Sequence, residues 1–146
     1  MEWLAALRGT TVGLDTGPLI YYIEEHPAYL PKIKPFFEAA ARGDFRIVTS
    51  FITLVEVLVH PLREGQPELA EEYRNILLQS AEITAIPLDE GIPEEAASLR
   101  ARHNLRTPDA IQLATAMRSG ASWFLTNDSS LAAVPGISVQ ILQNLA

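Results

Sequence analysis

The sequence predicts an α/β fold: a mostly parallel central sheet of four to five strands, with helices on both faces. This expectation rests on the alternation of two kinds of segment. Short apolar runs alternate with longer segments of helical period along the 146 residues. Such alternation implies crossover connections, which join parallel strands and place helices over the sheet. The chain has no internal repeat and is long enough for one buried core, so we expect a single domain over residues 1–146.

The expected strands are short and mostly apolar. They are residues 11–14 (TVGL), 45–49 (FRIVT), 83–88 (ITAIPL), 122–126 (SWFLT) and 137–142 (ISVQIL). In open parallel sheets, binding and catalytic sites form just beyond the carboxyl ends of the strands. Residues that directly follow these runs are therefore candidates for function.

The segments between the strands carry helix signals. Pro18 suits the first turn of a helix that ends before His26-Pro27, and Gly43 suits the end of the next helix. Ser50 is expected to cap a helix over residues 51–60 (FITLVEVLVH), which is apolar nearly all round, so we expect it to be buried and closed by Pro61. Three further helices are expected, over residues 68–82, 91–105 and 106–120, the last with Thr107 as its cap.

Composition excludes several classes of function. The chain has no cysteine, which removes disulfide frameworks, thiolate metal sites and cysteine nucleophiles. The amino-terminal residues have neither a basic leader nor a long apolar stretch, so we expect a cytoplasmic protein without a membrane span. The formal net charge of -7 argues against nucleic-acid binding unless cations neutralise part of the acidity.

Four acidic residues stand out against this background. Asp15 and Asp128 directly follow expected strands, and Asp109 begins a helix. Glu56 lies in TLVEVLV, where almost every neighbouring helical position is apolar, so we expect a cation or a strong hydrogen-bond donor beside it. Each aspartate also has a purely structural explanation, as a helix cap, as a favourable charge at a helix start or as the first residue of a turn.

A shared centre explains the four acids better than four coincidences. Carboxylates without histidine or cysteine at ligand spacing suit the hard cations Mg²⁺ and Mn²⁺, with water and substrate phosphate completing the coordination shell. Such a centre performs phosphoryl chemistry by activating a water and stabilising charge on the attacked phosphate. Divalent ions would also reduce the repulsion between an acidic protein and a polyanion.

Four segments carry a family resemblance, and the match as a whole spans residues 11–141. LDTGPLI, TLVEVLV around Glu56, LRTPDAIQLATA around Asp109 and FLTNDSSL around Asp128 resemble the ordered motifs of PIN-domain proteins, especially VapC-type ribonucleases of toxin–antitoxin pairs. The resemblance implies a three-layer PIN-like fold, a Mg²⁺- or Mn²⁺-dependent endoribonuclease, a homodimer and an antitoxin partner. It makes Asp15, Glu56, Asp109 and Asp128 the catalytic and metal-binding residues. Thr16 and Thr126 would support them.

The other functional hypotheses fit the sequence less well. Asp-Thr-Gly also occurs in aspartic proteases, but these are mostly β, whereas here proline and a helical pattern follow. A haloacid-dehalogenase-like phosphatase needs a second aspartate two residues after the first, where this chain has Gly17. Gly17 also departs from the PIN pattern, which often has serine or asparagine there. The remaining alternative is a PIN-scaffold module that binds RNA or protein with weak or no catalysis.

Substrate contacts are less well defined. Arg100, Arg102 and Arg106 lead into the helix of Asp109 and could line the site as phosphate-binding residues. The competing interpretation is a solvated helix face paired with Glu94 and Glu95.

Overall fold

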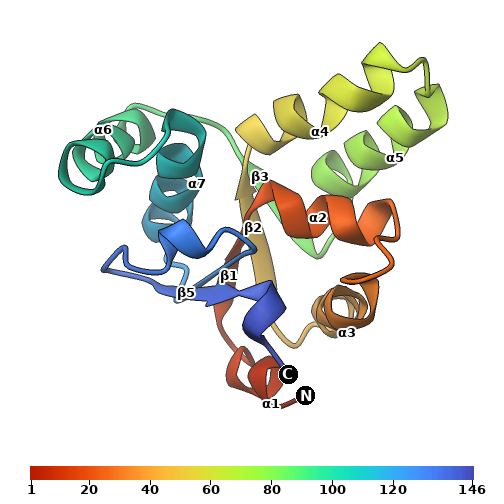
Figure 1. The fold of residues 1–146 in the computed structure, drawn as a ribbon, viewed down its shortest axis with the longest axis horizontal. Coiled ribbons are helices and arrows are strands. Elements are labelled where there is room, and N and C mark those ends of the chain that lie inside the picture. Colours follow the sequence, from red (N-terminus) through yellow and green to blue (C-terminus); the bar gives the residue numbers. More distant parts are fainter.

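A single five-stranded sheet forms the centre of the computed structural model, which describes all residues from 1 to 146 (Figure 1). All neighbouring strands are parallel, and their spatial order is β3-β2-β1-β4-β5. The strands are β1 (Thr11–Leu14), β2 (Arg46–Ser50), β3 (Ile83–Ile86), β4 (Trp123–Thr126) and β5 (Ser138–Ile141). The predicted fold class is confirmed, including the parallel strand direction.

Helices connect every pair of consecutive strands except β4 and β5, which a single 3₁₀ turn joins. The helices are α1 (Glu2–Ala6), α2 (Thr16–Ile23), α3 (Leu30–Ala41), α4 (Ile52–Arg63), α5 (Pro67–Leu78), α6 (Gly91–His103) and α7 (Thr107–Arg118), with 3₁₀ turns at Ser129–Leu131 and Leu142–Asn144. Helix α1, which has a little over one turn, was not predicted from the sequence. None of the helices is long and apolar enough to cross a membrane.

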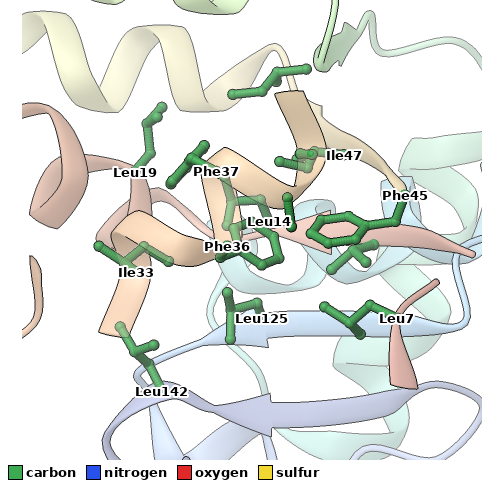
Figure 2. Packing of buried hydrophobic residues seen from close by; sticks show 14 of the residues in the cluster. Leu7, Leu14, Leu19, Ile33, Phe36, Phe37, Phe45, Ile47, Leu125 and Leu142 are labelled. Carbon is green, nitrogen blue, oxygen red and sulfur yellow. The ribbon is translucent and has the colours of Figure 1, made fainter. Parts of the chain in front are cut away.

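Two hydrophobic clusters lie on opposite faces of the sheet. Helices α1 to α5 contribute to the larger cluster, whose packing around Leu14, Phe36 and Leu125 is visible in Figure 2. Helices α6 and α7 cover the other face and pack around Phe124 of β4. Leu125 and Phe124 are adjacent in sequence but belong to different clusters, as expected where successive side chains of a strand point to opposite faces.

Gly13 lets α7 approach the middle of the sheet closely. A Cβ atom at this position would lie 2.5 Å from the Cβ of Ala116, which is closer than two carbon atoms can pack. The absence of a side chain on this face of β1 therefore sets the distance between α7 and the sheet. That distance matters for function because α7 carries Asp109.

The prediction of a buried helix after β2 was wrong. Helix α4 buries only Thr53, Val57 and Pro61, while the apolar side chains of Phe51, Val55, Val59 and Leu62 are between 38% and 63% exposed. The reason is that α4 packs along one side only, mainly against α5, so its other apolar face has no partner within the chain. Pro61 was also predicted to end this helix, but it lies inside α4, which continues for two more residues to Arg63.

Candidate active site

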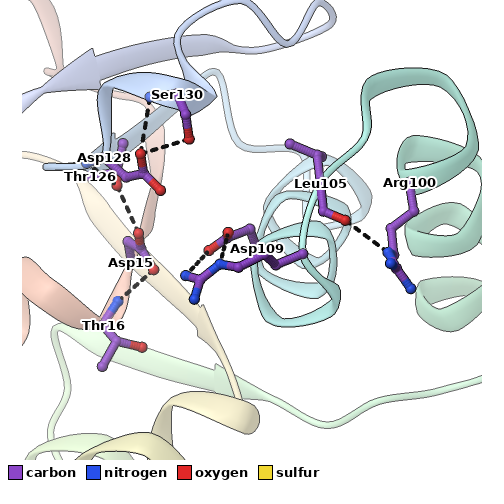
Figure 3. A network of polar contacts seen from close by, with 9 residues as sticks. Asp15, Thr16, Arg100, Leu105, Asp109, Thr126, Asp128 and Ser130 are labelled. Atoms are coloured by element: carbon purple, nitrogen blue, oxygen red, sulfur yellow. Dashed lines mark hydrogen bonds and ion pairs between the residues drawn. The ribbon is translucent and has the colours of Figure 1, made fainter.

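Asp15 lies where β1 ends and α2 begins, and it is held by two hydrogen bonds. Its side chain accepts from the backbone N–H of Thr16 at 2.8 Å, through Oδ1, and from the hydroxyl of Thr126 at 2.7 Å, through Oδ2. The first contact caps α2, so the structural explanation of Asp15 as a helix cap is confirmed. The second contact ties β1 to the end of the neighbouring strand β4, as Figure 3 shows.

Electrostatics connects Asp15 to two other acids. Burial is the main cause that raises the pKa of Asp15, and the negative charges of Asp109 and Glu56 raise it further, while the hydrogen bonds from Thr126 and Thr16 act in the opposite direction. Asp15 lies at the junction of β1 and α2, Asp109 lies in α7 and Glu56 lies in α4. Distant parts of the chain therefore bring the carboxylates of Asp109 and Glu56 within electrostatic reach of Asp15 at the carboxyl end of the sheet.

Glu56 reaches this region from the exposed side of α4. Its Oε1 atom accepts a hydrogen bond from the Thr16 hydroxyl at 2.6 Å. The expected strong donor is therefore present, but it is a neutral hydroxyl rather than a cation. The residue is also exposed rather than surrounded by apolar side chains, because α4 turns this face toward solvent. Thr16 thus contacts two of the predicted acids, Asp15 through its amide and Glu56 through its hydroxyl.

Asp109 is the most buried of the four acids, with a side chain that is 11% exposed. It lies in the first turn of α7, where the helix dipole favours a negative charge. Its partner is Arg106, whose Nε donates to Oδ2 at 3.0 Å and whose Nη2 donates to Oδ1 at 3.4 Å. Arg106 is also the N-cap residue of α7, so Thr107, predicted to be the cap, is instead the first residue of the helix.

Asp128 follows β4 and starts a 3₁₀ turn. Its Oδ1 atom accepts from the backbone N–H of Ser130 at 3.0 Å and from the Ser130 hydroxyl at 2.7 Å. Its own backbone N–H donates to the hydroxyl oxygen of Thr126 at 3.0 Å. Thr126 therefore links Asp128 to Asp15 through one oxygen atom. Figure 3 shows Asp15, Asp109 and Asp128 around one region, each from a different element.

A buried polar network around Gln112 lies beneath the acids and was not predicted from the sequence. Gln112 is 2% exposed, and its Nε2 donates to Thr53 at 2.6 Å and to Thr16 at 3.4 Å. Its Oε1 accepts from the backbone N–H of Ser50 at 3.2 Å. Gln112 thereby connects α7 to α4, β2 and α2. The available signal was its position, one helical turn after Asp109 within an otherwise apolar face.

The donor set suits a hard divalent cation, but the carboxylates are not already arranged around one. All candidate ligands are oxygen atoms, and Glu56 and Asp128 each keep one carboxylate oxygen that accepts no hydrogen bond. No group of three or more His, Cys, Asp or Glu side chains has the spacing of a metal site. The contacts explain this, because each acid is held by its own donor. Binding an ion therefore requires some of these side chains to turn.

The three arginines predicted to contact substrate lie in different environments. Arg106 reaches Asp109. The Arg100 Nε donates to the backbone oxygen of Leu105 at 2.8 Å and thereby closes the loop between α6 and α7 (Figure 3). The Arg102 Nε donates to the backbone oxygen of Ser98 at 3.4 Å, within its own helix. Neither Arg100 nor Arg102 forms an ion pair with Glu94 or Glu95.

Sequence comparison identifies the family. The PIN domain model matches residues 12–137, which include all four acids. The chain belongs to the PIN domain family. Enzymes of this family are nucleases, and they generally use divalent metal ions. No curated protein sequence matches the chain significantly.

Solved structures of VapC-type toxins have the same fold as this PIN domain. VapBC2 from Rickettsia felis, bound to promoter DNA, matches with a TM-score of 0.70 and 16% identity, over 90% of this chain and 98% of that one. A toxin–antitoxin complex from Klebsiella pneumoniae matches with a TM-score of 0.68 and 26% identity, over 93% and 100% of the two chains. VapC20 from Mycobacterium tuberculosis, a toxin that cleaves the sarcin–ricin loop, matches with a TM-score of 0.67 and 17% identity, over 88% and 99%.

Proposed function

We propose that this chain, as one PIN domain over residues 1–146, is a Mg²⁺- or Mn²⁺-dependent endoribonuclease that hydrolyses RNA phosphodiester bonds in the cytoplasm. One observation carries the proposal: carboxylates from the β1–α2 junction, α4 and α7 lie at the carboxyl end of the sheet, where burial and, to a smaller extent, the charges of Asp109 and Glu56 raise the pKa of Asp15. Ionised carboxylates that lie close together repel one another when no cation is present. A divalent ion that binds between them relieves this repulsion, so its binding there is favourable.

In the proposed site, Asp15, Glu56, Asp109 and Asp128 hold the ion. A bound divalent ion would supply Lewis acidity toward the scissile phosphate and lower the pKa of the attacking water. Thr126 orients Asp15 and the Asp128 loop through its one hydroxyl, while Thr16 orients Glu56. Both threonines are buried, so the carboxylates start from fixed positions. Arg100, Arg102 and Arg106 remain candidates for contacts to RNA phosphates, and Arg106 has the best position.

We also propose that the protein is the toxin of a toxin–antitoxin pair and forms a homodimer. The Klebsiella pneumoniae toxin–antitoxin complex supports the first proposal, since its similarity extends over 93% of this chain. The exposed apolar stripe of α4, formed by Phe51, Val55, Val59 and Leu62, supports a protein interface. Apolar side chains spaced three or four residues apart on one helix face form a continuous surface, which favours burial against another chain.

The central test is cleavage of RNA by the purified protein and by Asp15→Asn. We expect the wild-type protein to cut single-stranded RNA with Mn²⁺ or Mg²⁺ and to lose this activity in a chelator. We expect Asp15→Asn to lose at least about 100-fold in rate, because a ligand to the proposed ion is weakened. Asp44→Asn is the matched control, since Asp44 pairs with Arg42 on the surface.

Three outcomes would contradict the assignment. Equal cleavage by wild type and Asp15→Asn would exclude the proposed site, and cleavage that persists in a chelator would exclude the metal. RNA binding without any cleavage would favour the alternative of a non-cutting PIN module. Circular dichroism spectra of the variants would confirm that each of them is folded.

A further inference from the structure

Arg106 is the only cation that forms an ion pair with any of the four acids. The chain contains three salt bridges, and the other two, Arg42–Asp44 and Arg74–Glu71, lie elsewhere on the surface. Asp15, Glu56 and Asp128 are held by hydroxyl and amide donors, which carry no net charge. The arrangement therefore gives one acid, Asp109, a positive partner from within the chain.

The Arg106–Asp109 pair is unequal in its exposure to water. The arginine side chain is 77% exposed, whereas the aspartate side chain is 11% exposed. The guanidinium can therefore return to water at little cost, but the carboxylate cannot lose its partner without gaining another one. Each oxygen atom of Asp109 accepts one hydrogen bond from Arg106. A divalent cation that binds Asp109 therefore competes with the guanidinium for these oxygens and repels its positive charge.

Arg106 also lies close to the rest of the acidic centre. The Asp109 carboxylate that it contacts lies around the same region as Asp15 and Asp128 (Figure 3). The backbone of Arg106 is fixed as the N-cap of α7, three residues before Asp109. When the side chain leaves Asp109, the guanidinium therefore stays at the mouth of the site. An RNA phosphate in that position is the natural partner for a free guanidinium.

We propose that Arg106 is an exchangeable counter-ion: it holds Asp109 before the divalent ion binds, competes with the ion for that carboxylate, and once displaced contacts an RNA phosphate. This inference rests on the proposed function. Arg106 is thus a positioning residue in the metal-free protein and a substrate-binding residue in the loaded one. The two roles exclude each other in time, since one guanidinium cannot fill both positions.

Metal binding without RNA tests the first role. Titration calorimetry with MnCl₂ should give Arg106→Gln a dissociation constant lower than that of the wild type by about twofold to fivefold, the effect of removing one partly exposed ion pair. Arg42→Gln is the matched control, because it removes the same charge and an ion pair that lies elsewhere on the surface. We expect its affinity for Mn²⁺ to stay within about 1.5-fold of wild type, since solvent and salt screen a charge at that distance.

Thermal stability separates this role from a merely structural one. Without metal, Arg106→Gln should melt at a lower temperature than wild type, because Asp109 has lost its partner. At saturating Mn²⁺ the difference should disappear, because the ion then occupies Asp109 in both proteins. If Arg106 only anchored the start of α7, the difference would persist with metal. That result, or unchanged affinity for Mn²⁺, would overturn the proposal.

RNA binding tests the second role. The probe is a single-stranded phosphorothioate oligoribonucleotide, which resists hydrolysis, and the readout is the salt dependence of its fluorescence anisotropy. With Mg²⁺, Arg106→Gln should weaken binding and reduce the log–log salt slope by about 0.7, the value for one phosphate contact on a single strand. Without Mg²⁺ the slopes of variant and wild type should agree. An equal slope with Mg²⁺, or an equal loss with and without it, would overturn the second role.

The outcome also shows which hypothesis fails. If the wild-type protein binds no Mn²⁺ and cuts no RNA, both the proposed function and the role of Arg106 are wrong. If it binds Mn²⁺ and cuts RNA but Arg106→Gln binds Mn²⁺ with unchanged affinity, only the role of Arg106 is wrong. Arg106→Lys refines a positive result: it keeps the charge without the two-point contact, so its Mn²⁺ affinity should lie between those of wild type and Arg106→Gln.

Discussion

Helices α4 and α7 have the same length but opposite relations between composition and burial. The sequence of α4, ITLVEVLVHPLR, is the more apolar, yet only three of its 12 residues are buried. The sequence of α7, TPDAIQLATAMR, includes Asp109, Gln112 and Thr115, yet seven of its 12 residues are buried. What lies on either side of a helix therefore decides its burial. Helix α7 has the sheet on one side and α6 on the other, whereas α4 packs mainly against α5.

The comparison also explains where the candidate site lies. The small side chains of α7 permit close packing, and its buried polar groups are all paired, Asp109 with Arg106 and Gln112 with Thr53. Helix α4 contributes Glu56 and Thr53 from its side facing the site and leaves an apolar stripe on the outside. Helix α7 is thus a closely packed support for the site, and helix α4 connects the site to an exposed apolar surface. Four experiments test this difference between α4 and α7.

Removing the polar centre of α7 should have the largest effect. Gln112→Leu keeps a similar volume but leaves the buried N–H of Ser50 without its acceptor, and it leaves the Thr53 hydroxyl with Thr49 as its remaining partner. We expect the free energy of unfolding to fall by about 3 kcal/mol, the upper end of the cost for an unsatisfied buried group. Urea denaturation of this variant and of Gln79→Leu, an exposed control, measures it. Equal losses in the two variants would show that the network adds no stability.

Filling the gap between α7 and the sheet should have a somewhat smaller effect. The new Cβ of Gly13→Ala would lie 2.5 Å from the Cβ of Ala116, so the helix must shift. We expect a loss of about 2 kcal/mol from this overpacking, measured by urea denaturation. The double variant Gly13→Ala with Ala116→Gly should recover part of the loss. No recovery would mean that the strain lies within the strand rather than between strand and helix.

The pH dependence of stability tests the environment of Asp15, to which α4 contributes Glu56 and α7 contributes Asp109. Burial raises the pKa of Asp15, and the charges of Asp109 and Glu56 add to the effect. Between its unfolded-state and folded-state pKa values such a carboxyl binds more protons when folded, so the free energy of unfolding falls as pH rises through that window. In Asp15→Asn this contribution is absent. Without divalent ions, the melting temperature of the variant should therefore decline less than that of wild type above about pH 4. Parallel curves would contradict this assignment.

A charge on the outer face of α4 should change stability least. Val55 is 63% exposed, so Val55→Asp should alter the free energy of unfolding of a dilute sample by no more than about 0.5 kcal/mol. Val57→Ala, on the buried side of the same helix, should cost more. If the stripe is a homodimer interface, Val55→Asp should also shift the protein toward monomer in sedimentation equilibrium. An unchanged distribution would place any dimer contact elsewhere.

The sequence predicted all five strands because each is a short apolar run bounded by residues that stop regular structure. Errors appeared where a local pattern permits more than one outcome. Proline can end a helix or lie inside one, as Pro61 does, and a Thr-Pro start leaves the cap uncertain by one residue, as at Thr107. Gln112 was missed because one glutamine in an apolar face gives no sign of the partners it will meet. The metal-binding and catalytic roles of the four acids remain predictions.

The order of strands and helices, the parallel direction of the strands and the place of Asp15 and Asp128 at strand ends follow from the sequence alone, because hydrophobic periodicity and turn residues act over a few neighbours. Tertiary structure decided which face of α4 is exposed, how closely α7 approaches Gly13, and that Arg106 holds Asp109 while Thr126 holds Asp15. The last of these contacts joins residues 111 positions apart. Such contacts depend on which surfaces pack together in the folded chain. A pattern of neighbouring residues does not predict that packing.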